Sequence, residues 1–288
     1  MFEFSKPDLT PETRQDLPGS FVGLSAGVTH YELSGDADGR RVVLIHGNAA
    51  PYVQWDNTIG DLRDAGCRVL RYDVIGHGFT DRPRLRTYDA QLYNTQLAEL
   101  IDRLDIPYPV SVVGTSQGGS IGACFAAAYP GRVERLALLA PFFDTHGGGI
   151  GAVLLKTPIV GELLLGLAPD SKIIDRTNYF VQSADKRTAL EHEIAKQLRF
   201  RGKRRAMLAN ARGDALVDAT SWYEGVKAQG IPTLLTWGTQ DKLLPEDSMS
   251  RLRDLLPDIE YHELEGAAHL AHYEFPDRIN PILTRFLR

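Results

Sequence analysis

VSVVGTSQG, residues 110–118, is a short apolar run that ends in a Gly-rich turn, and an apolar helical stretch follows it. Its last five residues form the pattern G-x-S-x-G, with Ser116 between Gly114 and Gly118. A serine at a tight strand-to-helix turn takes a strained backbone conformation, and small flanking residues leave room for it. Its hydroxyl group then stands clear of the sheet, beside a helix N-terminus that stabilises negative charge. The stretch predicts a nucleophilic serine; the alternative is a Gly-rich turn with an incidental serine.

The chain on both sides of this turn alternates short apolar runs with longer amphipathic ones, and it contains no internal repeat. Such alternation is typical of a mostly parallel sheet that helices cover on both faces. The pattern stops near residue 141 and resumes near residue 233. The sequence predicts strands at 42–46, 68–72, 110–114, 135–139, 233–237 and 259–264, and helices at about 55–65, 88–104, 117–129, 246–256 and 273–287.

Residues 142–216 interrupt the alternation without a convincing strand. A helical insertion into one sheet is the simplest interpretation. We therefore expect an N-terminal arm at 1–20, a catalytic domain at 21–141 and 217–288, and a helical cap (lid) at 142–216.

Two features of this predicted cap leave alternatives open. The apolar stretch at 150–167 either lines an acyl-chain pocket or packs on the catalytic domain. The basic run from Lys196 to Arg205 is expected to be a solvated helix face rather than a contact with an anionic surface.

A serine hydroxyl needs a base that takes its proton, and His269 is the best candidate among eight histidines. It follows the last predicted strand and precedes the final helix. Asp241 follows the penultimate strand and is expected to hold the imidazole ring and stabilise its cation. The chain order Ser, Asp, His is the one expected with this serine turn. The competitors are His272, expected at the surface or behind the base, and Asp144, which follows the strand at 135–139.

The segment HGNA, residues 46–49, follows a buried strand and completes the predicted site. A turn there aims a backbone N–H towards the same oxygen atom as the N–H of Gln117. Such a donor typically contributes on the order of 10²–10³ in rate. We assign this oxyanion hole to Asn48 and Gln117, with Ala49 as the substitute for Asn48 and a plain β-turn as the alternative. The residues expected to be structural near the site are His46, Gly47, His77, Gly114 and Gly118.

The composition argues against several classes of partner. The chain has 32 Lys and Arg against 37 Asp and Glu, a net charge of −5, so it has no general attraction to nucleic acid or anionic lipid. Its first residues do not resemble a secretory signal, and no apolar run approaches the roughly 18 residues of a membrane span. Cys67, at the start of a strand, and Cys124, within a helix, lack metal or redox spacing and are expected to be reduced packing residues. We therefore expect a cytoplasmic protein without stable membrane anchoring.

The order of these motifs resembles the α/β-hydrolase superfamily from about residue 19 to the C-terminus. The markers are the turn at 46–48, DVIGHG at 73–78, the serine turn, and Asp241 followed by His269. The resemblance implies an α/β-hydrolase fold: a mostly parallel eight-stranded sheet flanked by helices, with a helical cap after the sixth strand. Within the superfamily, GSF at 19–21, YD at 72–73 and DRP at 81–83 look like the monoacylglycerol-lipase-like and carbon–carbon-bond hydrolase groups.

One departure from a related group is informative. The sequence HGN at 46–48 is similar to the haloalkane dehalogenases, in which the asparagine side chain binds halide. Those enzymes and the epoxide hydrolases use an aspartate nucleophile that tryptophan follows, whereas this chain has Ser116 and Gln117. An alkyl-enzyme ester on aspartate is therefore excluded, and with it both activities.

The sequence thus predicts a serine carboxylesterase for small to medium acyl chains, acting without metal or organic cofactor on a small-molecule ester. The same triad also serves carbon–carbon-bond hydrolases of vinylogous diketones and acyl-lactonases, which stay open as alternatives. A ligand receptor that retains the hydrolase fold is the alternative from another class, although the intact Ser116, Asp241 and His269 argue against it. The oligomeric state stays open.

Overall fold

The computed structural model describes residues 5–48, 50–143, 150–213 and 218–288. Ala49 and Asp144, two of the residues considered above, lie outside the described residues.

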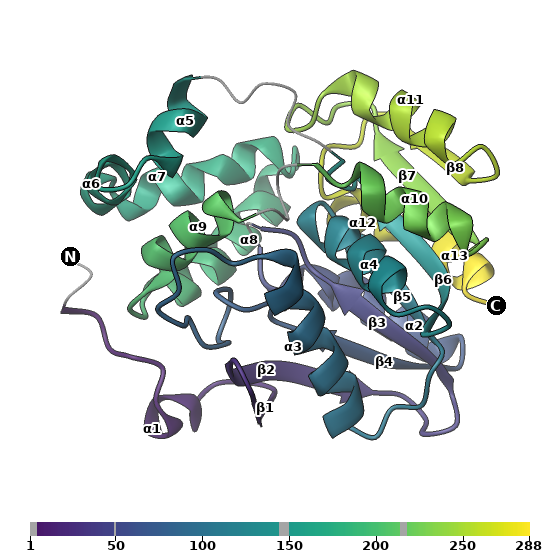
Figure 1. The fold of residues 1–288 in the computed structure, drawn as a ribbon, viewed down its shortest axis with the longest axis horizontal. Coiled ribbons are helices and arrows are strands. Elements are labelled where there is room, and N and C mark those ends of the chain that lie inside the picture. The colour runs from purple at the N-terminus through teal and green to yellow at the C-terminus, as the bar shows by residue number, and fades with distance from the viewer. Residues whose placement is uncertain (1–4, 49, 144–149, 214–217) are drawn as a thin grey trace.

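A single sheet of eight strands, in the order β1-β2-β4-β3-β5-β6-β7-β8, runs through the molecule (Figure 1). The pairs β1–β2 and β2–β4 are antiparallel, and every other pair is parallel. This is the mostly parallel eight-stranded sheet that the sequence predicts. The strands are β1 (Ser20–Leu24), β2 (Gly27–Ser34), β3 (Arg40–Ile45), β4 (Cys67–Tyr72), β5 (Val110–Thr115), β6 (Val133–Leu139), β7 (Thr233–Gly238) and β8 (Glu260–Leu264).

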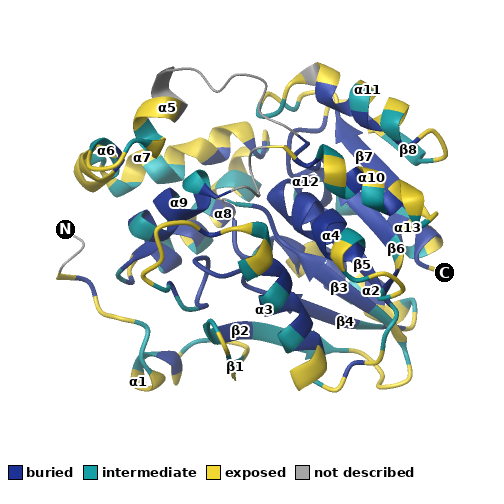
Figure 2. Cartoon of the chain, in the orientation of Figure 1, coloured by how far each residue is buried: buried dark blue, intermediate teal, exposed yellow. Residues whose placement is uncertain are grey.

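Helices cover both faces of the sheet, and a separate apolar core fills each side. One core joins the sheet to α3 (Ala90–Arg103), α4 (Gln117–Ala128), α10 (Thr220–Ala228) and α11 (Glu246–Leu255). The other joins it to α2 (Asp56–Asp64) and α13 (Pro276–Phe286). Figure 2 shows the central strands as buried along their length, because each packs against helices on both sides.

The helix predicted at 273–287 is in fact two helices, α12 (Ala271–Glu274) and α13. They meet at Phe275, which precedes Pro276 and takes φ −128° and ψ 61°. The ring of a proline clashes with a helical conformation of the residue before it, so the break falls at Phe275. Proline at the first position of α13 is in turn favourable, because no N–H is needed there.

The chain between β6 and β7 is helical, and no strand occurs in its described part at 150–213. One contact with the rest of the molecule is a third apolar cluster, in which Phe180, Leu190 and Ile194 meet Ala50 and Leu270. The division into arm, catalytic domain and cap stays a prediction. The elements are α5 (Ile150–Lys156), α6 (Val160–Leu167), α7 (Asp170–Ile174), the 3₁₀ helix η3 (Asp175–Tyr179), α8 (Ala184–Leu198) and α9 (Lys203–Arg212).

The apolar stretch at 150–167 fits neither of its two predicted roles as a whole. Helices α5 and α6 pack against α9, and none of their described side chains lines the cavity described below. Their outer side is apolar and solvent-facing, with exposed side chains at Val153, Leu154, Ile159, Leu163, Leu164 and Leu167.

The basic run at 196–205 is only partly the solvated face that the sequence predicts. Lys203 and Arg204 are buried. Arg204 is ion-paired with Asp170 and donates to the Leu165 carbonyl, so its side chain connects α9 to α7 and α6. A charge run read along the sequence does not reveal such carbonyl and carboxylate partners.

Two further features concern the predicted environment of the chain. Cys67 begins β4 and Cys124 lies within α4; both are buried as predicted, and neither is in a disulfide. None of the helices in the described ranges has the length and apolar character that crossing a membrane requires.

Candidate active site

Ser116 lies between the end of β5 and the first residue of α4, and its backbone takes φ 52° and ψ −124°. This conformation is costly for a residue with a Cβ atom and persists only where the surroundings hold it. Here the Ser116 N–H donates to the Leu139 carbonyl at 3.1 Å, and the Ser116 carbonyl accepts from Gly119 and Phe142. The strained turn predicted from the sequence is therefore present, and neighbouring backbone groups fix it.

The glycines around Ser116 are required by close approach of the backbone. A Cβ atom on Gly114 would lie 2.3 Å from the Gly118 carbonyl oxygen, and one on Gly118 would lie 2.2 Å from the Ile45 carbonyl oxygen. A Cβ atom on Gly47 would lie 3.0 Å from the Cβ atom of Ser116 itself. The structural roles predicted for these three glycines thus have a direct steric reason.

His269 and Asp241 form a buried pair, with 2.7 Å between His269 Nδ1 and Asp241 Oδ2. Both side chains are almost inaccessible, at 2% and 0% exposure. The other carboxylate oxygen of Asp241 accepts the Leu243 N–H at 2.8 Å. The carboxylate is therefore fixed from both sides, and the unused Nε2 of the imidazole is left for another partner.

His272, the competitor of His269, is not at the surface. It is 1% exposed, its ring centre lies 4.4 Å from that of Trp55, and burial lowers its pKa to about 3. Neither ring nitrogen has a hydrogen-bond partner among the described residues, and His272 does not line the cavity that contains Ser116. A neutral packing role fits this environment.

Asn48 and Gln117, the residues assigned to the oxyanion hole, are connected through Asn210 of helix α9. The Asn210 and Gln117 amides exchange two hydrogen bonds, at 2.6 and 3.0 Å. Asn210 Nδ2 also donates to Asn48 Oδ1 at 3.0 Å, and the Tyr93 hydroxyl donates to Asn210 Oδ1 at 2.5 Å. Asn210 is fully buried. One inserted side chain thus orients both predicted residues.

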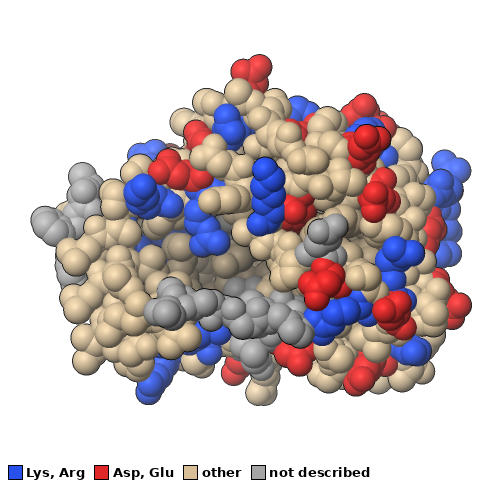
Figure 3. Space-filling model, turned by 90° about the horizontal axis from the view of Figure 1, so that it is seen from above, with Lys and Arg blue, Asp and Glu red and all other residues tan. Residues whose placement is uncertain are grey.

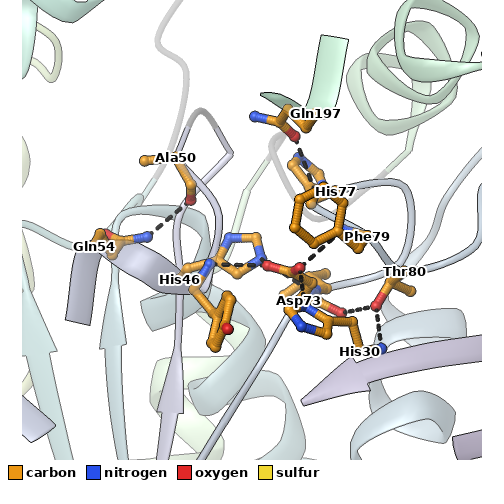
Figure 4. Close-up of polar contacts among 12 residues, drawn as sticks. His30, His46, Ala50, Gln54, Asp73, His77, Phe79, Thr80 and Gln197 are labelled. Atoms are coloured by element: carbon orange, nitrogen blue, oxygen red, sulfur yellow. Dashed lines mark hydrogen bonds and ion pairs between the residues drawn. The ribbon is translucent and has the colours of Figure 1, made fainter. Parts of the chain in front are cut away.

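The turn at 46–48 rests on a buried carboxylate, Asp73, at the end of β4 (Figure 4). Its two oxygens accept the backbone N–H groups of Tyr52 and Phe79, both at 2.9 Å. Oδ2 also lies 2.6 Å from His30 Nδ1. Burial on its own would raise the pKa of Asp73, but the contacts with His30 and His46 lower it overall. The ionised carboxylate of Asp73 therefore holds two loops beside the site through hydrogen bonds to their backbone N–H groups.

The contacts of His46 and His77 fit the structural roles that the sequence predicts for them. His46 Nε2 accepts the Val74 N–H at 2.9 Å and its Nδ1 donates to the Gly47 carbonyl at 2.6 Å. Burial lowers the pKa of His46 to about 4, so the ring is neutral at pH 7. His77 Nε2 lies 3.0 Å from Asn48 Oδ1. The two rings therefore fix the predicted oxyanion turn from behind.

Ser116, His269, Gly47 and Asn48 line one cavity of about 210 Å³. The molecule is hollowed on the face seen in Figure 3, where Lys and Arg side chains lie beside the hollow. Most of the other lining residues are apolar, and the inserted helices supply several of them: Ile173, Phe180, Ile194 and Met207. The cavity thus combines a serine and a histidine with an apolar wall, which suits an organic substrate with a reactive carbonyl group.

The sequence analysis does not identify three functional candidates in this region: the ionised carboxylate of Asp73, Asn210 and Lys203. Asn210 and Lys203 belong to α9, for which the sequence offers no motif, and only the fold brings them to the serine turn. Among the described residues, no group of three or more His, Cys, Asp or Glu side chains is arranged to hold a metal ion.

The sheet order, the serine turn after β5 and the buried Asp241–His269 pair define the class of α/β hydrolases. Residues 42–282 match the alpha/beta hydrolase family, and the chain belongs to this family.

Individual similarities span almost the whole chain. A 2-hydroxy-6-oxononadienedioate/2-hydroxy-6-oxononatrienedioate hydrolase from Cupriavidus pinatubonensis is 29% identical and covers 93% of this chain and 94% of its own length. Among solved structures, an enol-lactonase from Burkholderia xenovorans has a TM-score of 0.77 at 22% identity, covering 93% of this chain and 99% of its own. An esterase from Thermogutta terrifontis has a TM-score of 0.79 at 20% identity, covering 94% and 98%. The two structures share the fold.

Proposed function

We propose that this hydrolase cleaves carboxylic esters of small to medium acyl chains, with Ser116 as nucleophile, His269 as base and Asp241 as the acid that orients the base. The observation that carries the proposal is the convergence of two separate arrangements on one cavity. The strained Ser116 turn and the Asp241-bound His269 are far apart in the sequence, and Ser116 and His269 line the same cavity.

In the proposed reaction, Ser116 Oγ attacks the ester carbonyl while His269 Nε2 takes the hydroxyl proton. Asp241 accepts the Nδ1–H and stabilises the imidazolium ion that forms. His269 then gives its proton to the leaving alcohol, and an acyl-enzyme remains on Ser116. His269 next takes a proton from water as that water attacks the acyl group, which releases the acid and restores the serine.

We assign to the backbone N–H groups of Asn48 and Gln117 the stabilisation of the negative charge that develops on the carbonyl oxygen. Gln117 is the first residue of α4, where backbone N–H groups have no acceptor within the helix. The amide network through Asn210 supports this assignment because it limits the movement of both residues.

The first test compares hydrolysis of p-nitrophenyl acetate, butyrate and octanoate by the wild-type protein and by Ser116→Ala, after circular dichroism has established that both are folded. Loss of a triad nucleophile reduces turnover by on the order of 10⁶. We expect activity only in the wild type, with the best chain length indicating the depth of the pocket. Equal activity in both proteins contradicts the assignment of Ser116.

Carbon–carbon-bond hydrolysis is the second candidate function, and the similarity to the oxononadienedioate hydrolases favours it. The same triad serves this reaction, so geometry does not separate it from ester hydrolysis. A panel of p-nitrophenyl esters, homoserine lactones and ring-cleavage diketones distinguishes the two reactions. Efficient diketone cleavage with no ester hydrolysis rejects the esterase, and tight binding without turnover of any of the three favours a receptor.

A further inference from the structure

Lys203, the first residue of α9, is a buried lysine in the wall of the candidate active site. It lines the same cavity as Ser116 and is 3% exposed. Its Nζ donates to the Gly76 carbonyl at 3.3 Å, its one hydrogen bond among the described residues. An ammonium group has three N–H donors, so this contact uses only one of them.

No carboxylate within the described chain forms an ion pair with Lys203. The acid that acts on it electrostatically is Asp73, whose two oxygens already accept from Tyr52, Phe79 and His30. Burial lowers the pKa of Lys203 well below its usual value, and the neighbouring Arg82 lowers it further. A buried ammonium without a counter-ion is expensive, and a bound anion would supply that counter-ion and favour the charged form of Lys203.

The lysine and arginine side chains of the described cavity lining face no acidic residue within that lining. Arg176, an exposed residue of η3, is the second cation of its lining. None of the described lining residues is Asp or Glu. Apolar residues fill most of the wall between these charges, so a substrate that crosses the cavity needs an apolar body and a single charged end.

We propose that Lys203 binds a carboxylate of the substrate, so that the preferred substrate is an acid with its scissile carbonyl group at Ser116. This inference rests on the proposed function and deepens it, because it holds for an ester or a ketone at Ser116. A carboxylate is chosen over a phosphate because the wall holds one buried cation, which matches a single negative charge. Arg176 attracts the same anion on its way into the cavity.

The test uses pH-stat titration to compare two pairs of esters, the monomethyl and dimethyl esters of adipic acid and those of suberic acid; the members of a pair have the same diacid chain and differ in charge. We expect the wild type to prefer the monoester by about tenfold or more in kcat/KM, the range of a charged hydrogen bond. In Lys203→Met the preference falls towards unity, mainly because KM for the monoester rises. Lys203→Arg keeps part of the preference. No preference in the wild type, or an undiminished one in Lys203→Met, overturns the inference.

A matched control is Lys227→Met, which removes an exposed lysine on α10 outside the cavity. Like Lys203→Met, it removes one lysine, and we expect it to retain the full preference. If Lys227→Met loses the preference equally, general charge attraction is responsible and Lys203 has no specific role.

Inhibition separates the two kinds of anion. Hexanoate and butyl phosphate are compared as competitive inhibitors of the wild type and Lys203→Met. Stronger inhibition by hexanoate that depends on Lys203 supports the carboxylate site, and stronger inhibition by butyl phosphate overturns it.

A binding measurement covers the case in which Lys203→Met does not fold. Calorimetric titration of folded Ser116→Ala with each ester is expected to show tighter binding of the monoester, and equal binding contradicts the inference. This outcome is independent of turnover. If Ser116→Ala abolishes hydrolysis but charge has no effect on binding, the proposed function stands and the carboxylate site fails.

Discussion

At the scale of single residues, steric contact around Ser116 limits which amino acids fit. Hydrogen bonds to the N–H and carbonyl groups of Ser116 hold its φ at 52°. The Ser116 backbone therefore cannot rotate to make room for a larger neighbouring residue. Gly47 is the neighbour on the side of the predicted oxyanion turn, and the nearest atom to an added Cβ there is the Cβ of Ser116.

We therefore predict that Gly47→Ala lowers kcat by less than the factor on the order of 10² that a displacement of about 1 Å produces, because relief of the 3.0 Å contact with the Ser116 Cβ atom needs only a smaller shift of the reactive serine. The control is Gly23→Ala in β1, where an added Cβ atom meets nothing within 4 Å. Steady-state kinetics of both variants check this. Wild-type kcat in Gly47→Ala shows that the turn tolerates a side chain and that close approach to Ser116 is not needed.

The sequence identifies residues whose chemistry is tied to a local pattern. Ser116 has its flanking glycines, and Asp241 and His269 each follow a strand near the end of the chain; the structure places the last two in direct contact. Lys203 and Asn210 have no such pattern, because their roles depend on burial and on partners more than 80 residues away. Burial also decides between the two positions expected for His272, at the surface or behind the base: the sequence gives no sign of the Trp55 ring that covers it.

At the scale of elements, the short helix α12 buries a histidine at an energetic cost that depends on pH. The pKa of His272 is about 3 in the folded protein against an ordinary value of 6.5, because burial disfavours its cation. Below pH 6.5 the unfolded chain therefore binds a proton that the folded protein does not. His272 contributes no such penalty above pH 6.5, and the loss of stability grows as the pH falls towards 3.

We predict that His272→Phe makes the acid dependence of stability shallower by up to ~1.4 kcal/mol per pH unit between pH 6 and 4, which corresponds to one proton. Urea unfolding at several pH values measures this slope. His192→Gln, which removes an exposed histidine on α8, should leave the slope unchanged. An unchanged slope in His272→Phe means that His272 becomes protonated in the folded state.

Strands and helices with a strong apolar period could be predicted from the sequence, and strands β3 to β8 lie where it places them. The hairpin of β1 and β2 was not located, because its residues are mostly half-buried and lack a continuous apolar run. The break before α13 was missed because a proline permits a helix start as readily as it ends one.

At the scale of the whole molecule, hydrogen bonds connect the inserted segment to the residues around the serine turn. Asn210 of α9 contacts Gln117 and Asn48, and Phe180, in the segment before α8, accepts the Leu270 N–H beside His269. A shift of these helices would therefore move the groups assigned to the oxyanion.

We predict that Asn210→Ala lowers kcat more than it raises KM, because it releases Gln117 and Asn48 rather than a substrate contact. It should also destabilise the fold by ~1–3 kcal/mol, the cost of unpaired buried amides. Asn178→Ala, an exposed asparagine of η3, is the matched control and should change neither. Reduced stability with wild-type kcat assigns Asn210 a purely structural role.

The most direct test of the central claim, that Ser116 is an activated nucleophile, is covalent labelling with a fluorophosphonate followed by peptide mass spectrometry. A serine with an adjacent base reacts with this probe, whereas an ordinary serine does not. We predict one adduct per chain, on the peptide that contains Ser116, no adduct in Ser116→Ala and strongly slowed labelling in His269→Ala. An adduct on another residue, or ester hydrolysis by a protein that the probe does not label, would contradict the claim.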